Sequence, residues 1–165
     1  MKKRSVMTVM LALFLLLCSC NVEESGGEGV EYVFESGEAR VSVGDDADEV
    51  LAALGEYRSS HISPSCASEG EEIMYVYDGF RITSAPCGER NFIYIIELTS
   101  DAVSTPEGIS VGAARDEVVS AYGYGYRAVG ESLEYRSDTC ILQFVVREGR
   151  VSSVRYIAAD KQNTN

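Results

Sequence analysis

Residues 41–55 read VSVGDDADEVLAALG, and residues 109–123 read ISVGAARDEVVSAYG. The two stretches lie 68 positions apart, and eight of their fifteen aligned residues are identical. Agreement of this extent inside one chain of 165 residues indicates an internal repeat. We therefore expect the fold to be built from two related units.

Each copy of the repeat predicts an extended segment, a turn and a short helix. Apolar residues alternate with serine ahead of Gly44 and Gly112, which is the period of a half-buried extended segment. Acidic residues follow in the first helical turn, where the helix dipole favours negative charge, and Asp45 or Asp46 can cap the first helix. A closing glycine suits the left-handed residue that ends many helices. One face of each helix is apolar, through Val50, Leu51 and Leu54 in the first copy and Val118, Val119 and Tyr122 in the second.

The segments after each helix predict antiparallel strands. Residues 57–72 resemble a polar loop with room for a second short helix, and residues 73–77 and 80–83 alternate around an Asp-Gly pair, a strong hairpin signal. Residues 91–98 predict a third strand that is apolar on both faces. The strands expected in the second copy are residues 133–136, 140–147 and 151–158. The predicted fold class is therefore α+β, with two tandem repeats, each a short helix (or two) packed on a three-stranded antiparallel sheet.

The N-terminus has the features of a bacterial lipoprotein leader. Three basic residues precede an apolar run, and the sequence Leu-Cys-Ser-Cys at 17–20 closely resembles a lipobox. In this interpretation residues 1–19 are a signal peptide, and Cys20 carries the lipid and becomes the mature N-terminus. An ordinary secretory signal and a retained transmembrane anchor are the alternatives, but the apolar run is short for a spanning helix. We therefore expect the protein on the extracytoplasmic face of a bacterial membrane, anchored by its lipid.

The leader and the repeat together predict the domain organisation. Residues 20–38 are rich in Glu and Gly and predict a flexible acidic tether. Residues 39–101 form the first repeat, residues 102–160 the second, and residues 161–165 a polar tail.

The mature chain is expected to be strongly acidic. Loss of residues 1–19 removes three basic residues and leaves 11 basic against 26 acidic residues, a formal charge of −15. Such a body repels nucleic acid and has no electrostatic attraction to an anionic membrane surface. The lipid is therefore the expected link to the membrane.

Three cysteines remain once the leader is removed and Cys20 is lipidated. Cys66 and Cys87 bracket the predicted hairpin, whereas Cys140 lies in a predicted strand of the second repeat. One disulfide and one free thiol are expected in an oxidising compartment, and we favour the pair Cys66 and Cys87. Their spacing does not suit a structural zinc site, which takes four ligands in close pairs.

Several of these motifs occur together in a known family of envelope proteins. The pattern runs from ISVG and DEVVSAYG through LEYRS to LQFVVREGRVSSVRY, and it resembles the BamE (SmpA/OmlA) family and the related β-lactamase-inhibitor-protein-like fold. Both are secreted or lipoprotein families, and the inhibitor carries the unit in tandem. The resemblance covers residues 40–158 and implies a tandem fold of this kind, with enzyme inhibition as one function.

Candidate catalytic and metal-binding residues are few. The acidic cluster at 45–49 suits helix capping better than calcium, because no twelve-residue loop with a distal glutamate surrounds it. His61 lies among serines without the G-x-S-x-G turn of a serine hydrolase. No paired arrangement is evident for the three remaining candidates, Glu97, Glu134 and Glu148. The sequence therefore predicts no enzyme, no metal site, no cofactor and no small-molecule substrate.

Five tyrosines in predicted strands are candidates for a partner-binding surface: Tyr75, Tyr77, Tyr94, Tyr135 and Tyr156. Such amphipathic rings either pack in a core beneath the helices or present a rigid surface to a protein partner. The favoured function is a membrane-anchored extracytoplasmic lipoprotein that serves as a protein-binding or scaffold module in the envelope. The alternative is an inhibitor-like protein that masks a secreted or envelope enzyme through its sheet face.

The leader predicts that Cys20→Ser blocks processing or releases the protein from the membrane, because no acyl chains would then hold it. Metabolic labelling with a fatty-acid analogue measures the outcome, and Cys18→Ser is the matched control that should keep the label. Undiminished label in the Cys20 variant would contradict the lipoprotein assignment.

Overall fold

The computed structural model describes residues 30–64 and 70–159. The predicted signal peptide, Cys20, Cys66 and the polar tail lie outside these ranges. Within the described part of the chain, no helix is both long enough and apolar enough to cross a membrane.

A two-stranded ribbon comes first, followed by two runs of one helix and four strands. The ribbon consists of β1 (Phe34–Ser36) and β2 (Ala39–Val41). The first run comprises α1 (Ala47–Leu54), β3 (Ser59–Pro64), β4 (Glu71–Val76), β5 (Phe80–Cys87) and β6 (Arg90–Leu98). The second run comprises α2 (Arg115–Tyr122), β7 (Arg127–Val129), β8 (Ser132–Arg136), β9 (Cys140–Arg147) and β10 (Arg150–Ala158).

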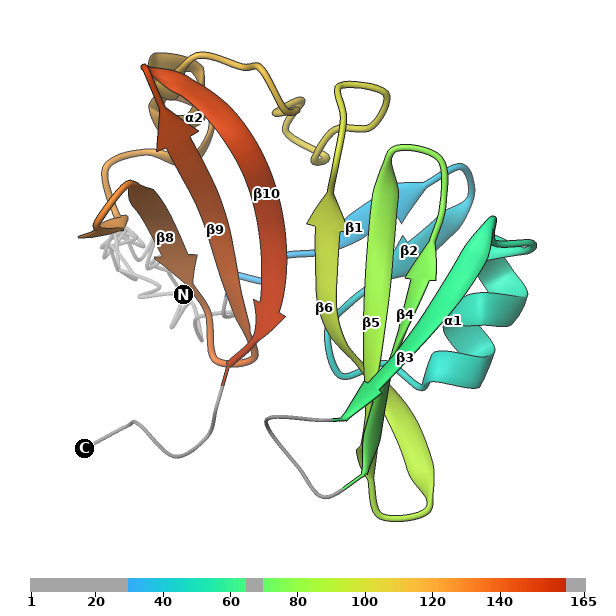
Figure 1. Cartoon of the computed structure of the whole chain (residues 1–165). Helices are drawn as coiled ribbons and strands as arrows, with labels where there is room; N and C mark the ends of the chain where they lie inside the picture. The colour runs from blue at the N-terminus through green and yellow to red at the C-terminus, as the bar shows by residue number, and fades with distance from the viewer. Residues whose placement is uncertain (1–29, 65–69, 160–165) are drawn as a thin grey trace, which may run out of the picture.

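The strands of the two runs form one antiparallel sheet in the order β3-β4-β5-β6-β10-β9-β8-β7. The last strand of each run pairs with the other at the centre, with Glu97 opposite Arg155 and Ile96 opposite Tyr156. Because both central strands end their runs, the second half of the sheet repeats the first in reverse order across this pair (Figure 1). The sheet edges are therefore β3 and β7.

The predicted fold class, with each helix on its own three-stranded sheet, is wrong. The described chain is mostly β structure, each helix precedes four strands, and the eight strands share one sheet. The missed strands are β3, placed in the range predicted as a polar loop with room for a helix, and β7. Both are edge strands whose side chains are exposed throughout, so backbone pairing holds them without the alternating burial that reveals a strand in a sequence.

The repeated stretch docks each helix against the last strand of its own run. The backbone N–H of Gly44 donates to the carbonyl of Ile93 at 2.7 Å, and the N–H of Gly112 donates to the carbonyl of Val151 at 2.8 Å. Ile93 and Val151 donate back to the residue after each glycine. The glycines take φ values of 92° and 93°, which a side chain would strain. This shared geometry explains why the same residues recur at both positions.

Both helices end in matching ways. Asp46 caps α1 by accepting hydrogen bonds from two backbone N–H groups in the first turn, as predicted. Gly55 and Gly123 follow the two helices with φ values of 75° and 78°. The Tyr77 hydroxyl donates to the carbonyl of Gly55 at 3.5 Å, and the Tyr135 hydroxyl donates to that of Gly123 at 2.8 Å. Tyr77, directly after β4, and Tyr135, within β8, therefore fasten the helix ends to the sheet.

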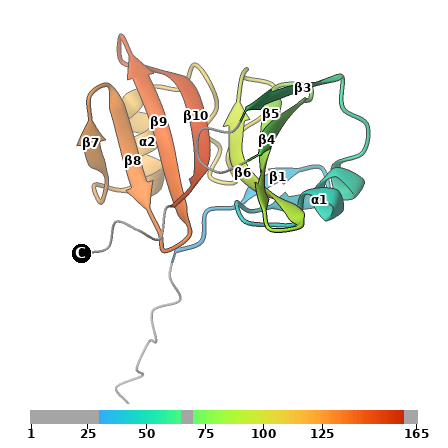
Figure 2. The same ribbon diagram turned by 60° about the horizontal axis from the view of Figure 1, so that its bottom comes forward.

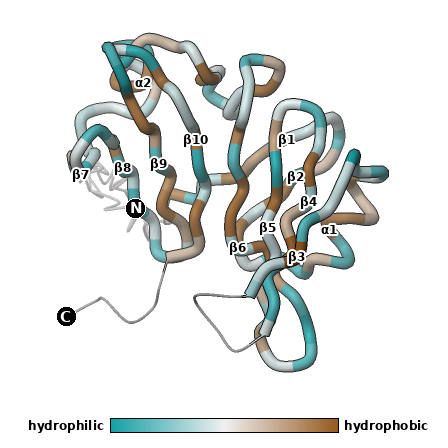
Figure 3. Tube along the Cα trace, in the orientation of Figure 1, coloured by the Kyte–Doolittle hydropathy of each residue, from teal (hydrophilic) through white to brown (hydrophobic). Residues whose placement is uncertain are grey.

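The helices and the ribbon cover one face of the sheet (Figures 1 and 2). Phe34 of β1 is fully buried there, with its ring centroid 4.8 Å from that of Phe80 in β5 and 6.2 Å from that of Tyr156 in β10. One hydrophobic core thus extends beneath both halves, and Figure 3 shows hydrophobic stretches along β6 and β9. Because β1 falls in the range predicted as a tether, residues 20–38, that end of the range is folded.

The shared core predicts cooperative unfolding. Val50 of α1 and Val118 of α2 are both buried in it, so Val→Ala at either position should cost about 1 to 3 kcal/mol through lost burial and cavity formation. Urea denaturation followed by circular dichroism should show both variants lowering one common midpoint, whereas Ser120→Ala, exposed on α2, should change it little. Two separate transitions, each moved by only one variant, would show that the halves fold independently.

Candidate functional site

The five candidate tyrosines do not form an exposed surface. Tyr77, Tyr135 and Tyr156 are 8%, 3% and 1% exposed and belong to the core. Tyr75 is half-buried and packs against the same core, and half-buried Tyr94 lies where the pairing of β5 with β6 shifts register. Tyr75, Tyr77, Tyr135 and Tyr156 therefore belong to the core on the covered face, and the five tyrosines do not form the shared partner-binding surface that the sequence predicted.

The opposite face of the sheet lies open, because no helix or strand within residues 30–64 and 70–159 crosses it (Figures 1 and 2). Strand register places two rows of side chains on this face. Residues directly opposite one another form the charged row, which consists of Arg81, Glu97, Arg155, Gln143 and Glu134. The apolar row lies two positions further along the strands and consists of Met74, Ile95, Ile157 and Ile141, with Thr83 between Met74 and Ile95.

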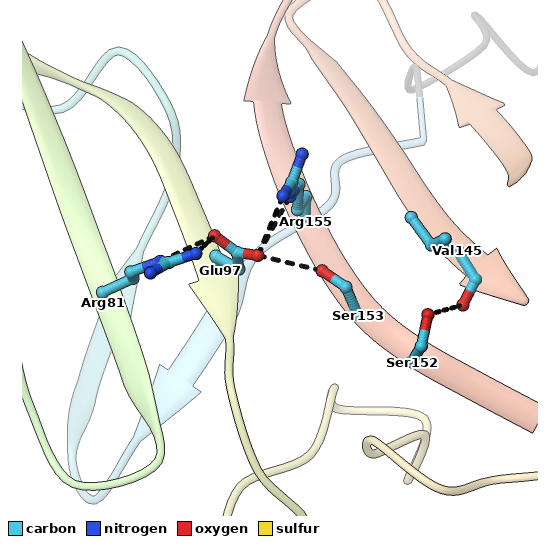
Figure 4. Close-up of polar contacts among 6 residues, drawn as sticks. All are labelled: Arg81, Glu97, Val145, Ser152, Ser153 and Arg155. Atoms are coloured by element: carbon cyan, nitrogen blue, oxygen red, sulfur yellow. Dashed lines mark hydrogen bonds and ion pairs between the residues drawn. The ribbon is translucent and has the colours of Figure 1, made fainter. Parts of the chain in front are cut away.

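Glu97 is the centre of the charged row. Its carboxylate accepts hydrogen bonds from Arg81 Nε at 2.7 Å on one side, and from Arg155 Nε and Ser153 Oγ, both at 3.1 Å, on the other (Figure 4). The residue is 9% exposed, whereas the two arginine side chains keep 38% and 41% of their surface exposed. A buried anion therefore holds two partly exposed arginine side chains in place across three strands.

The environment keeps Glu97 ionised. Burial opposes the charged form, but the hydrogen bond from Arg81 and the positive charges of Arg155 and Arg81 outweigh it, and the pKa of Glu97 is lowered. A carboxylate with a lowered pKa and both oxygens occupied is a poor general acid. The arrangement suits recognition by fixed charges better than proton transfer.

The other candidate residues from the sequence do not converge on Glu97. Glu134 lies three strands further along the charged row, on β8, and accepts from Gln143 Nε2 at 3.2 Å and from Arg136 at 3.1 Å. Glu148 lies exposed at the turn between β9 and β10, and His61 lies on the exposed edge strand β3 opposite Met74. In the described ranges, no group of three or more His, Cys, Asp or Glu side chains could hold a metal ion.

The cysteines divide between surface and core. Cys87 is exposed at the end of β5, and its predicted partner Cys66 lies outside the described residues, so the disulfide stays a prediction. Cys140 is buried, and burial raises the pKa of its thiol to about 12. The Cys140 thiol therefore stays protonated and unreactive at neutral pH.

Sequence reasoning missed Arg81, Arg155 and Ser153 as members of a site. The available signal was the alternation of these polar residues with apolar ones along two strands. That alternation predicts an outward face but not which strands are neighbours. The three residues come together only because β6 pairs with both β5 and β10.

Comparison with known proteins identifies the fold but no family. No family model and no curated protein matches the chain. A similar solved structure is that of an extracellular protein containing an SCP domain from Bacillus anthracis strain Ames, with a TM-score of 0.53 and 15% identity. The match covers 74% of this chain and 49% of the other, so the chain spans about half of that protein's length. At this identity the likeness concerns the fold alone, and the resemblance to the BamE family stays a prediction.

The contacts of Glu97 predict that the free energy of unfolding decreases in acid. Because its pKa is lower in the folded state, Glu97 stabilises the fold above its unfolded pKa, and this contribution is lost as pH falls through the folded pKa. Glu97→Gln should lower the free energy of unfolding at pH 7 by about 1 to 3 kcal/mol, and the deficit should shrink in acid. Urea denaturation between pH 7 and pH 3 measures both effects.

The matched control for Glu97→Gln is Glu131→Gln, which removes an exposed carboxylate 3.2 Å from Arg147. Exposed ion pairs contribute little, so this variant should unfold like the wild type across the pH range. A Glu97→Gln curve that coincides with the control curve at every pH would show that the Glu97 contacts do not stabilise the sheet.

Proposed function

We propose that this protein is an extracytoplasmic lipoprotein, anchored by Cys20, that binds another envelope or secreted protein through the open face of its sheet. The single observation that carries the proposal is the pairing of the charged row with the apolar row on a face that the described helices and ribbon leave uncovered. The helices and the ribbon cover the other face of the sheet, so a partner reaches the strands themselves through the open face.

The composition of the open face suits a protein partner. Met74, Ile95, Ile141 and Ile157 are half-exposed and contribute apolar area that a partner could bury. Arg81 and Arg155 lie beside them, and both side chains are partly exposed to solvent. Because Glu97 already holds both arginines, a partner carboxylate would find donors whose conformational entropy is largely lost before binding.

Two observations support the extracytoplasmic location. The leader at residues 1–20 has the order of features expected of a lipoprotein signal. The structurally similar protein from Bacillus anthracis is described as extracellular, which agrees with that location. The mature charge of −15 favours a body held away from anionic lipid, so the open face stays available to proteins.

Site-specific photo-crosslinking in intact cells tests this proposal. A photoreactive amino acid at Ile157 or Ile141 on the open face should give a discrete adduct with another protein, because a bound partner would cover these positions. The same amino acid at Ala52 or Ser120, both exposed on the helices, is the matched control and should give none.

The identity of the adduct separates the two roles of the protein. A structural envelope component in the adduct supports a scaffold, and an enzyme whose activity falls on binding supports an inhibitor. Ile95→Asp, on the open face and outside the Glu97 contacts, should abolish the adduct because it places a charge where a partner would bury apolar area. Equal adducts from the open face and from the helices, or none at Ile157 and Ile141, would refute the docking face.

A further inference from the structure

The edge of the sheet at β3 has little of the protection that exposed edges usually carry. β3 is six residues long, pairs with β4 without a shift in register and has exposed side chains throughout (Figure 1). Among the strands in the described ranges, it is the one without an Asp, Glu, Lys or Arg residue. Natural proteins usually shorten, charge or bulge such a strand, because its free backbone groups can pair with another chain. Pro64 ends the strand and leaves Ser59–Ser63 able to pair.

The other edge of the sheet is protected. β7 holds the equivalent place in the second run, but it is only three residues long and begins with the charged residue Arg127. A short, charged strand offers few backbone groups to another chain. The two runs share their architecture, so the difference between their edges marks β3 as the edge that is available for pairing.

Exposed apolar side chains lie at this same edge. Ile62, within β3, is 63% exposed and opposes Ile73 of β4. Tyr57, just before β3, is 45% exposed and packs on Tyr75 of β4, with ring centroids 5.1 Å apart. Ile62 shares the face of Ile73 and Tyr75, because residues two apart on a strand point to the same side. A strand added beside β3 would therefore bury part of Ile62 as well as satisfy free backbone groups.

The two ends of β3 carry opposite charges, and this pattern is complementary to itself. Arg58 precedes the strand with an exposed side chain, and exposed Glu71 of β4 opposes Pro64 at the far end. If β3 pairs antiparallel with β3 of a second copy, the basic end of each strand meets the acidic end of the other. With Ser59 opposite Ser63, Arg58 of each copy falls in line with Glu71 of the other. The two contacts are identical, as a two-fold axis requires.

We propose that two copies of this chain form a two-fold symmetric dimer by antiparallel pairing of Ser59–Ser63 with the same segment. The two Ile62 side chains become diagonal neighbours on one face of the joined sheet. The chain already pairs equivalent strands of its two runs in this way, β6 with β10. The formal charge of −12 opposes contact between copies elsewhere, so the uncharged strand is where they can meet. The dimer uses a sheet edge, so it does not depend on the docking face.

Photo-crosslinking between two differently tagged copies of the full chain, expressed in the same cells, tests the dimer. A photoreactive amino acid at Ser63 should give an adduct that carries both tags, and the same amino acid at Val129 on β7 should give none. Ile62→Lys should abolish the Ser63 adduct, because like charges from the two copies would meet at the edge. Its matched control, Val129→Lys, adds the same charge to the other edge and should keep the adduct. Both side chains are exposed, so both variants should keep the wild-type circular dichroism spectrum.

A charge exchange tests that the partner is a second copy in the proposed orientation. Arg58→Glu should lose the Ser63 adduct, and Arg58→Glu combined with Glu71→Arg should restore it, because each copy then presents the reversed pair to the other. Arg58 also contacts Asp78 in its own chain, but exposed pairs of this kind contribute little to folding. The proposal is overturned if Ser63 gives no adduct, if the adduct holds another protein in place of a second copy, if Ile62→Lys keeps it, or if the charge exchange fails to restore it.

Discussion

The antiparallel pairing of β6 with β10 is the interaction on which the rest of the structure depends. It joins two runs that would each leave an unpaired central edge, and it aligns their side chains on both faces at once. On the covered face Ile96 opposes Tyr156 within the core. On the open face Glu97 opposes Arg155 and closes the network that Arg81 begins.

The covered face depends on this pairing because Phe34 packs across it. Its ring contacts Phe80 from the first half and Tyr156 from the second, so the ribbon holds together a core that neither half could complete. A run of about sixty residues buries too little surface to be comfortably stable alone. One shared core solves that problem.

Glu97, on the open face, has the burial of a catalytic carboxylate but a different role. Glu97 is buried and ionised, but its oxygens are occupied by two arginines and a serine. Removal of either arginine would leave the buried carboxylate of Glu97 with less compensating positive charge. This cost explains why the carboxylate has so many hydrogen-bond partners. The arginines it positions, with the apolar row beside them, make a surface for recognition rather than for proton transfer.

Local sequence was sufficient for the cap of α1, the closing glycines and the hairpin, because each depends on residues a few positions apart. It did not reveal the exposed edge strand β3, whose pairing leaves no burial pattern in its side chains. The merging of both halves into one sheet, the inward direction of Tyr135 and Tyr156 and the meeting of Arg81, Glu97 and Arg155 were decided only by tertiary structure. These features depend on register between strands that are distant in the chain, and a shift of one residue would exchange the two faces.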